Sequence, residues 1–422
     1  MYTSVLKTQK VFGAKKYMKN ICIFVLFIIF TAVFQYEVQA QTELEIVKKV
    51  SNEIQIDSLN SFLKDLTGVN PVIIDGKLDT ITGRYAYSEG GVLASKYIEE
   101  NLRNFGYKIS SQAFTEYGYN VIAEKSGILY PEKKYIICAH YDTMPYIELS
   151  PGADDNGSGT SAVLEAARVL KDYNSNYSII FALWDEEETG LEGSKYFAKK
   201  AFESGEDILG IINLDMIGYN VNDNLTVILT VEDSKELAYT VIDINEKMDV
   251  GLTLQLDINE RPDGSDEMSF QEYGYKAILL EELMPRSYPH YHQITDTFDK
   301  IDHEYHFKNT RLAISTLTYL VELSEATFVN EDNFVADYFL KQNYPNPFNP
   351  TTTISYLVRE RSNVNIEVYN IMGQKIKDLV NQEMKSGTYE VEFDATNLPS
   401  GVYFYNLIAK DYKQTNKMLL IK

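Results

Sequence analysis

Cysteine is scarce in this chain, with two residues, Cys22 and Cys138, among 422. Cys22 lies in an N-terminal apolar run that we expect to be removed. Cys138 lies in the apolar run Tyr135–Ala139, which predicts a buried thiol. The mature chain therefore has no partner for a disulfide, and a metal site in it must use nitrogen and oxygen ligands.

Basic residues are also few, 39 Lys and Arg against 61 Asp and Glu, for a net charge of −22. Nucleic-acid binding requires a basic face, so this balance argues against DNA or RNA as a partner. Strong acidity is compatible with a soluble protein that works outside the cell.

The chain has one long apolar run near its start, Ile21–Phe34, preceded by Lys15, Lys16 and Lys19. It is too short for a comfortable membrane span and is followed by small residues at Val38–Ala40. We therefore expect residues 1–40 to be a secretory signal peptide, with Met18 as a possible true start and a membrane anchor as the alternative. Its removal takes five Lys and one Glu, leaving 34 basic and 60 acidic residues, no stable membrane span and a net charge of −26.

Residues 41–328 have the pattern of one catalytic α/β domain. Residues 41–118 are expected to be largely helical, with residues 90–105 the clearest amphipathic helix. Continuous apolar runs then alternate with helical segments, which indicates a mostly parallel central sheet covered by helices on both faces. The expected strands are 120–123, 134–140, 178–184, 208–214, 225–229 and 277–280, and the expected helices 161–173, 192–202, 234–248 and 307–323.

The remainder of the chain has a different composition. Residues 329–341 are expected to be a linker, and the segment Gln342–Pro350 is rich in Pro and Asn. Short alternating runs follow at 352–358, 364–368, 388–393, 402–408 and 417–421. We therefore expect residues 342–422 to form a small all-β sandwich, without catalysis because it lacks histidine and clustered carboxylates.

Four polar residues stand at or just after the ends of three predicted strands, where an open α/β sheet forms its ligand crevice. His140 ends one strand, Glu187 and Glu188 follow another, and Asp215 follows a third. The segment Gly152–Gly159 adds Asp155 between glycines that allow a tight turn; without a following Gly-Lys-Ser/Thr it is a poor phosphate loop.

Imidazole and carboxylate groups in this order indicate a catalytic zinc site. The five candidate ligands are His140, Asp155, Glu188, Asp215 and His292, and two metals would need one bridging carboxylate among them. Glu187 then remains as a general base for a metal-activated water. There are simpler alternatives: His140 could be a core residue, residues 185–188 a solvated face, and Asp154 a turn residue. His290 is the alternative to His292 as the last ligand.

These motifs resemble the co-catalytic di-zinc metallopeptidases that include bacterial leucyl aminopeptidases and aminopeptidase Y, over about residues 119–298. The resemblance implies that Asp155 bridges two zinc ions, that His140 and Asp215 complete the first, and that Glu188 and His292 complete the second. In the family the aspartate corresponding to Asp142 orients the ligand histidine, and the peptide bond after the bridging aspartate is typically cis.

Further roles follow from the same resemblance. Glu187 is the implied base. Four acids occur in a row at 185–188, so the base could be assigned one residue away, and the alignment of Gly190-Leu191 with the family motif favours Glu187. Asp296 is expected to support His292, and Tyr291 to donate a hydrogen bond to the developing oxyanion. The chain departs from the family at Glu267, where members often have histidine, and this leaves the substrate preference open.

The C-terminal segment resembles the sorting domains of proteins exported by the type IX secretion system. The motifs are Asn343–Pro350, Ser400–Phe404 and the Lys-flanked apolar end at 417–422. The resemblance implies a secreted or cell-surface protein whose C-terminal domain contacts the secretion machinery; a sandwich that binds carbohydrate or protein is the alternative.

The sequence thus predicts a secreted zinc exopeptidase, most simply an aminopeptidase acting on peptides with two Zn²⁺ per chain. A glutaminyl cyclase with one zinc, a carboxypeptidase, and a surface adhesin whose hydrolase domain has decayed are the alternatives. The preferred N-terminal residue is left undetermined, because the loops around residues 261–265 and 283–288 cannot be placed from sequence.

Overall fold

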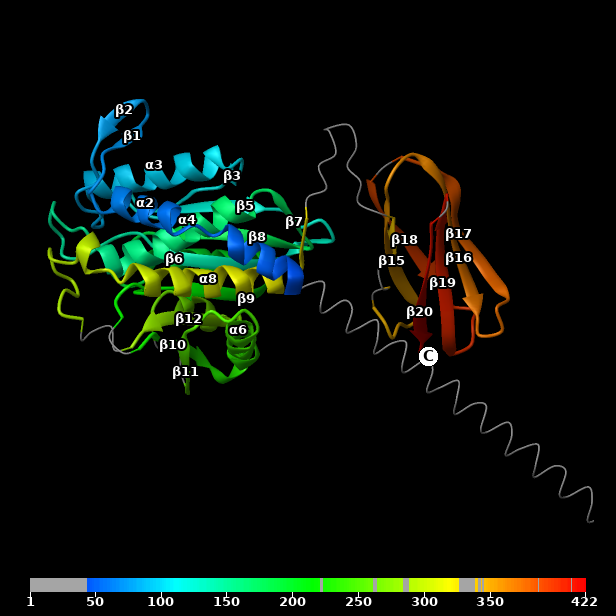
Figure 1. Cartoon of the computed structure of the whole chain (residues 1–422). Helices are drawn as coiled ribbons and strands as arrows, with labels where there is room; N and C mark the ends of the chain where they lie inside the picture. Colours follow the sequence, from blue (N-terminus) through cyan, green and yellow to red (C-terminus); the bar gives the residue numbers. More distant parts are fainter. Residues whose placement is uncertain are drawn as a thin grey trace, which may run out of the picture. The chain divides into compact units, whose positions relative to one another are not determined.

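The computed structural model describes residues 44–220, 223–260, 264–283, 288–325, 338–340, 343, 345–385, 387–410 and 412–422. The predicted signal peptide and most of the predicted linker lie outside these ranges. Backbone contacts divide the chain into two units, which meet in sequence after Ala326. Each unit is described by itself (Figure 1).

A mixed nine-stranded sheet forms the centre of the first unit, with the order β11-β10-β12-β9-β6-β8-β5-β3 and β4 paired to β5. Its four central strands, β12, β9, β6 and β8, are mutually parallel. β10 and β11 run antiparallel to this core on one side and β5 on the other. The strands are β3 (Lys108–Ile109), β4 (Gln112–Ala113), β5 (Tyr119–Lys125), β6 (Tyr130–His140), β8 (Tyr177–Trp184), β9 (Asp207–Leu214), β10 (Leu225–Val231), β11 (Thr253–Asn259) and β12 (Ala277–Glu282).

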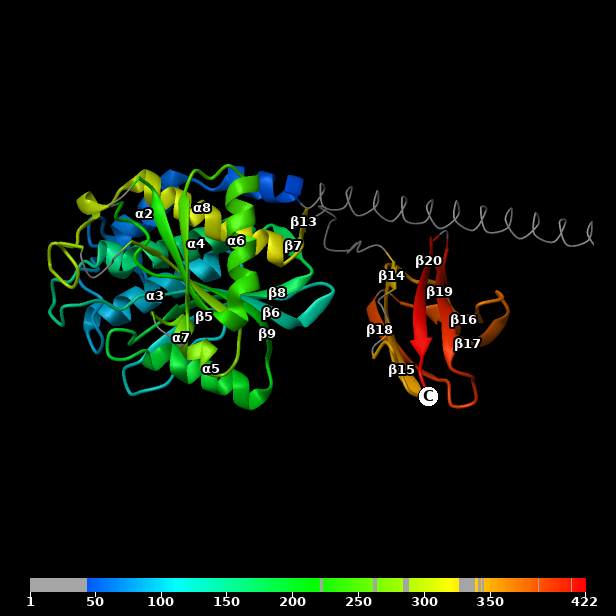
Figure 2. The same ribbon diagram turned by 90° about the horizontal axis from the view of Figure 1, so that it is seen from below.

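Helices cover both faces of this sheet (Figure 2). Along β6, Ile137 and Ala139 face a core that includes α2, α3, α4, α6 and α8, whereas Ile136 and Cys138 face a smaller core with α5 and α7. This alternation follows from the two-residue period of a strand. The helices are α2 (Ile56–Leu66), α3 (Glu89–Asn104), α4 (Gly159–Leu170), α5 (Glu192–Ser204), α6 (Lys235–Lys247), α7 (Glu267–Gln271) and α8 (His303–Leu320), after a helix over residues 44–53.

The predicted mostly parallel sheet with helices on both faces is confirmed, and so is the buried thiol of Cys138. The expectation that residues 41–118 are largely helical is wrong in two places. A hairpin, β1 (Val72–Ile74) and β2 (Lys77–Asp79), separates α2 from α3, and β3 and β4 pair with β5. These strands are two or three residues long, too short to produce a periodic sequence signal.

The second unit is an all-β sandwich around its own apolar core, as predicted. One sheet has the order β14-β15-β18 and the other β17-β16-β19-β20. Its strands are β14 (Phe339–Leu340), β15 (Thr351–Val358), β16 (Ser362–Asn370), β17 (Lys375–Met384), β18 (Gly387–Asp394), β19 (Gly401–Ala409) and β20 (Tyr412–Leu420). A further two-stranded sheet, β7 (Tyr173–Ser175) with β13 (Leu323–Glu325), belongs to the first unit. No helix in the described ranges is long and apolar enough to cross a membrane.

Candidate metal centre

The carboxyl ends of the central strands bring the predicted ligands into one crevice. His140 is the last residue of β6, Glu187 and Glu188 follow β8, and Asp215 directly follows β9. Asp155 comes from the turn that leads into α4. His292 comes from the segment after β12 and has a positive φ of 55°.

Asp155 lies between the two histidines. Its Oδ1 is 3.4 Å from His140 Nε2, and its Oδ2 is 3.2 Å from His292 Nε2. The peptide bond between Asp155 and Asn156 is cis, as the resemblance predicted. A carboxylate that presents one oxygen to each of two histidines has the arrangement of a bridging ligand.

Two groups of potential ligand atoms share this crevice. His140, Glu187 and Asp215 form one group, and Asp155, Glu188 and His292 form the other; within each group the ligand atoms lie within 4.8 Å of one another. His140 Nε2 is 3.3 Å from Asp215 Oδ1, and His292 Nε2 is 3.0 Å from Glu188 Oε2. Glu187 is thus a member of the first group, and its carboxylate lies within 4.8 Å of the His140 and Asp215 ligand atoms.

Several buried atoms in the crevice have no hydrogen-bond partner. They include His292 Nε2 and Glu188 Oε1. Buried polar atoms are nearly always satisfied, so orphaned atoms at one point indicate a missing partner. Two imidazoles with carboxylate oxygens match the ligand preference of zinc, and the residues present therefore fit two such ions.

Burial and neighbouring charges shift the pKa values of these groups. Burial raises the pKa of Glu188 to about 8, assisted by Asp155, and that of Glu187 well above its ordinary value. Burial opposes ionisation of Asp155, but the two histidines outweigh it and lower its pKa to about 2. Burial also opposes the charge on His140, but the surrounding carboxylates raise its pKa well above 6.5. Such an excess of acids is balanced most directly by bound cations.

Asp142 is fully buried beneath the crevice. Its Oδ1 accepts a hydrogen bond from the Glu187 amide at 3.1 Å, and its Oδ2 accepts one from the Glu188 amide at 3.2 Å. His140 Nδ1 lies 3.2 Å from the Asp142 backbone oxygen and 3.4 Å from Oδ1. One carboxylate therefore positions a histidine from one strand and two glutamates from the next.

The turn that carries Asp155 is held from below by Arg84 and Asp296. The buried Arg84 guanidinium donates to four backbone carbonyls, of Tyr141, Leu66, Pro151 and Gly152. The glycines in this turn are needed for space: Gly152 has φ of 51°, and a Cβ on Gly159 would lie 2.3 Å from the carbonyl oxygen of Leu214.

Asp296 has different contacts from those expected. Its carboxylate accepts from the amides of Asp154 and Asp155 and from the Tyr288 hydroxyl, and none of these hydrogen bonds involves His292. Asp296 therefore holds the turn that carries Asp155. The two segments are more than 140 residues apart in sequence, and the fold brings them side by side. Asp154 accepts from the Gly218 amide, a structural contact consistent with its turn role.

The two competing histidines are separated by the fold. His290 Nδ1 lies 2.8 Å from Thr295 Oγ1, away from the ligand groups, whereas His292 lies in the second group. The Tyr291 ring stacks on the His292 ring with 3.7 Å between centroids. Burial, with Asp155 and Glu188 next in effect, raises the pKa of the Tyr291 hydroxyl, which therefore stays protonated as a donor near these carboxylates.

The segment 265–267, where the sequence departs from the family pattern, lies next to Glu187, although neither Ser265 nor Asp266 was predicted as a site residue. Ser265 Oγ donates to Glu187 Oε1 at 3.5 Å, and both Asp266 carboxylate oxygens are buried without a hydrogen-bond partner. Glu267, the departure from the family pattern, is buried and accepts from Asn213 Nδ2 at 3.1 Å. The available signals were the departure from the family pattern at Glu267 and an acidic pair at the start of a short helix, and neither assigns a role to Ser265 or Asp266.

Two family models match the chain. The model described as peptidase family M28 matches residues 120–317, which include every predicted ligand and Glu187. The model described as a secretion system C-terminal sorting domain matches residues 342–422. The resemblance proposed for each part of the chain is thereby confirmed.

Relatives and solved structures agree with the first match. A probable leucine aminopeptidase 1 of Trichophyton verrucosum is 26% identical over 304 residues, or 63% of this chain and 77% of that protein. The Legionella pneumophila LapA aminopeptidase superposes with a TM-score of 0.55 at 21% identity, over 66% of this chain and 75% of that chain. The glutaminyl cyclase of Porphyromonas gingivalis has the same fold, with a TM-score of 0.51 at 20% identity over 63% and 98% of the two chains. Residues 120–317 therefore match peptidase family M28, the relatives of the chain include proteins named as leucine aminopeptidases and zinc metalloproteases, and residues 342–422 match a secretion sorting domain.

Proposed function

We propose that the chain is an exported aminopeptidase that binds two zinc ions and uses Glu187 as its general base. The observation that carries this proposal is the position of Asp155, with one carboxylate oxygen facing each histidine. His140 and Asp215 would complete one zinc site, and Glu188 and His292 the other. Bound there, the ions would polarise the scissile carbonyl and lower the pKa of the attacking water.

In this proposal Glu187 moves the proton. Its carboxylate lies within 4.8 Å of the His140 and Asp215 ligand atoms, and its backbone amide donates to Asp142. It would take one proton from the attacking water as the new C–O bond forms, and give that proton to the nitrogen as the C–N bond breaks. A pKa raised by burial suits this exchange near neutral pH.

Tyr291 would donate from its hydroxyl to the oxygen that develops negative charge. Its ring is held against His292, which fixes the direction of the hydroxyl relative to the second ligand group. A donor that is already oriented stabilises the transition state without reorganisation.

The charge of the site favours the amino end of a peptide. Six carboxyl groups lie in or beside the two groups, more negative charge than two zinc ions neutralise: Asp142, Asp155, Glu187, Glu188, Asp215 and Asp266. A terminal ammonium is attracted to such a site, and a terminal carboxylate is repelled. An arginine at the site could instead attract a terminal carboxylate. The buried Arg84 already donates to backbone carbonyls, and Arg261 and Arg286 lie outside the described ranges.

A glutaminyl cyclase is the second candidate, because the P. gingivalis enzyme shares the fold. The second ligand group argues against a one-zinc site. Cyclisation of peptides with N-terminal glutamine, with one zinc per chain, would favour the cyclase.

For export, we propose that residues 1–40 direct the chain across the inner membrane and that residues 342–422 direct it through the type IX machinery. The sorting-domain match supports secretion or display at the cell surface. Residues 41–328 would then be the catalytic domain and residues 329–341 the linker.

The test is hydrolysis of aminoacyl p-nitroanilides and their N-acetylated forms, with and without a chelator. We expect cleavage of only the free-amine compounds, loss with chelator and recovery with zinc. Glu187→Gln should abolish turnover while zinc remains bound, and the exposed Glu192→Gln serves as the matched control. Near-normal kcat in Glu187→Gln, or cleavage of N-acetylated peptides from their carboxyl end, would overturn the proposal.

A further inference from the structure

A cavity of about 460 Å³ lies beside the metal centre and has no part in the mechanism above. It is bounded by the first turns of α3, the loop before that helix and the chain leading into β5. Five tyrosine side chains dominate its wall: Tyr85, Tyr87, Tyr117, Tyr119 and Tyr141. Its volume is within the range of small-ligand sites.

The cavity and the ligand groups share two chain segments. Tyr141 lies between His140 and Asp142, and Asp185 lies two residues before Glu187. Successive residues of an extended chain point to opposite sides, so His140 faces the metal centre while Tyr141 faces the cavity. Asp185, just after the end of β8, also lines the cavity.

Two exposed tyrosines lie on the surface between the metal centre and the cavity. The Tyr87 hydroxyl donates to Glu186 Oε2 at 3.3 Å, and the Tyr146 hydroxyl donates to the Glu188 carbonyl at 2.9 Å. Their side chains are 59% and 47% exposed. A peptide with its amino end at the metal centre would cross these rings to reach the cavity.

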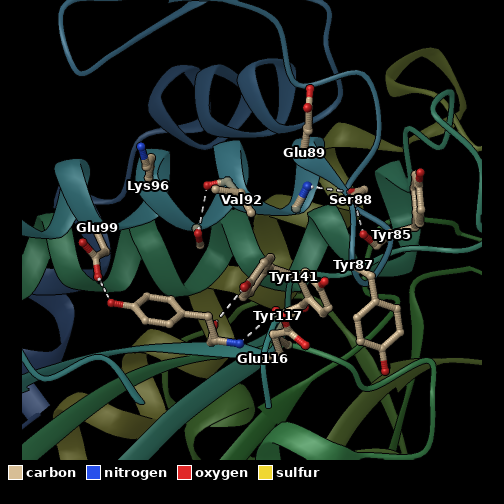
Figure 3. Close-up of a pocket in the computed structure, with 14 residues that line it drawn as sticks. Tyr85, Tyr87, Ser88, Glu89, Val92, Lys96, Glu99, Glu116, Tyr117 and Tyr141 are labelled. Atoms are coloured by element: carbon tan, nitrogen blue, oxygen red, sulfur yellow. Dashed lines mark hydrogen bonds between the residues drawn. The ribbon is translucent and has the colours of Figure 1, made fainter. Parts of the chain in front are cut away.

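The charge that faces the cavity is negative. The acidic residues that line it, Glu89, Glu99, Glu116 and Asp185, outnumber the basic one, Lys96. In Figure 3 Glu116 and Tyr117 lie on one side of α3, and the ends of the Glu89 and Lys96 side chains on the other. Lys96 is paired with Asp75 at 2.7 Å. The Glu116 carboxylate is exposed, and in the described part of the chain it has no partner.

Two rings next to Glu116 are arranged as an aromatic corner. Tyr87 and Tyr117 meet edge to face, with 5.9 Å between centroids, and the Tyr117 side chain is 57% exposed. Aromatic faces beside a free carboxylate bind a cation through both its charge and its hydrocarbon stem.

We propose that this cavity is a subsite for a lysine or arginine side chain of the peptide substrate, downstream of the scissile bond. This inference rests on the proposed peptidase function and adds to it a preference at a position remote from the reacting bond. Glu116 supplies the charge, and Tyr87 and Tyr117 supply the rings.

The test uses hexapeptides of leucine followed by five alanines, in which lysine, glutamate or norleucine replaces one alanine in turn. An extended peptide advances ~3.4 Å per residue, so these positions cover about 17 Å beyond the first residue. Binding to the zinc-loaded full chain carrying Glu187→Gln is measured by calorimetry, which does not depend on turnover. Norleucine keeps the stem of lysine without the charge.

At one position lysine should bind about three- to tenfold more tightly than norleucine, the size expected for a half-exposed cation on rings and a carboxylate. Adding Glu116→Gln or Tyr117→Ala should remove this difference, Glu116→Lys should transfer it to glutamate, and the exposed Glu132→Gln in β6 should leave it unchanged.

Equal binding of lysine and norleucine at all five positions would overturn the inference, as would a lysine preference that survives Glu116→Gln. Hydrolysis of leucine p-nitroanilide by the wild-type chain tests the proposed function separately, because that substrate has no residue beyond the scissile bond. Lysine-dependent binding without hydrolysis would support the subsite and refute the peptidase.

Discussion

The substitution Asp142→Asn tests whether a buried carboxylate organises the metal centre without binding metal itself. The carboxylate accepts one amide hydrogen bond on each oxygen, from Glu187 and from Glu188. Asparagine keeps the shape but offers one oxygen and one NH₂ group. One amide would therefore face a donor instead of an acceptor.

The structure sets the size of the effect. Hydrogen bonds to charged groups contribute about 1.5–3 kcal/mol, and a buried amide left without a partner costs about 1–3 kcal/mol. In the metal-free protein this cost is partly offset, because Asp142 helps to raise the pKa of Asp185 to about 7, an effect second to burial, and its loss relieves that repulsion. Zinc binding should weaken about 10–100-fold, as for other partners that orient metal ligands, or ~1.4–2.8 kcal/mol.

Zinc affinity is measured by competition with a chelator, and thermal unfolding with and without zinc. The Tm of the zinc form should fall more than that of the metal-free form. Asp207→Asn, at the exposed opposite end of β9, is the matched control and should change neither quantity. Wild-type zinc affinity in Asp142→Asn would refute the reasoning, since the glutamate ligands would then not depend on these hydrogen bonds.

Three other predictions follow from the supports of the site. Asp296→Asn should weaken zinc binding and lower the free energy of unfolding in urea by about 1–3 kcal/mol. Tyr288→Phe removes one hydroxyl contact and should lower it by about 1 kcal/mol. Equal losses of unfolding free energy and of zinc affinity in the two variants would contradict this. Arg84→Met should cost about 3 kcal/mol or more by the same measurement, because four buried carbonyls lose their donor; wild-type stability would contradict it. Burial raises the pKa of Asp266 to about 7 and of Glu267 to about 8, so the native state binds more protons than the unfolded state between about pH 4 and pH 8. Stability therefore falls as pH rises through that window: the metal-free Tm should be higher at pH 5 than at pH 8, and Glu267→Gln should reduce the difference.

The order of the central elements was predictable because the buried strands are continuous apolar runs. Residues 136–139 and 179–184 have both faces covered by helices, so nearly every side chain is apolar. β17 was not predicted, since Lys375–Met384 has mostly exposed and polar side chains at the edge of its sheet. β11 was missed for a related reason: it is an edge strand with partly exposed residues that alternate in polarity.

The site was predictable where a ligand ends a strand. His140 and Asp215 stand at the carboxyl ends of neighbouring strands β6 and β9, and sheet topology alone brings them together. The partners of Asp296 were not predictable, because they depend on how a loop after β12 returns to the turn before α4. Ser265 and Asp266 likewise gain their meaning from proximity to Glu187, which no local pattern records.

The most direct test of the central claim is the leucine p-nitroanilide activity of chelator-stripped full chain as zinc is added in known equivalents. If Asp155 joins two zinc sites, activity should rise until two equivalents are bound and then remain constant. Full activity at one equivalent, or no activity at any zinc concentration, would contradict the two-zinc aminopeptidase.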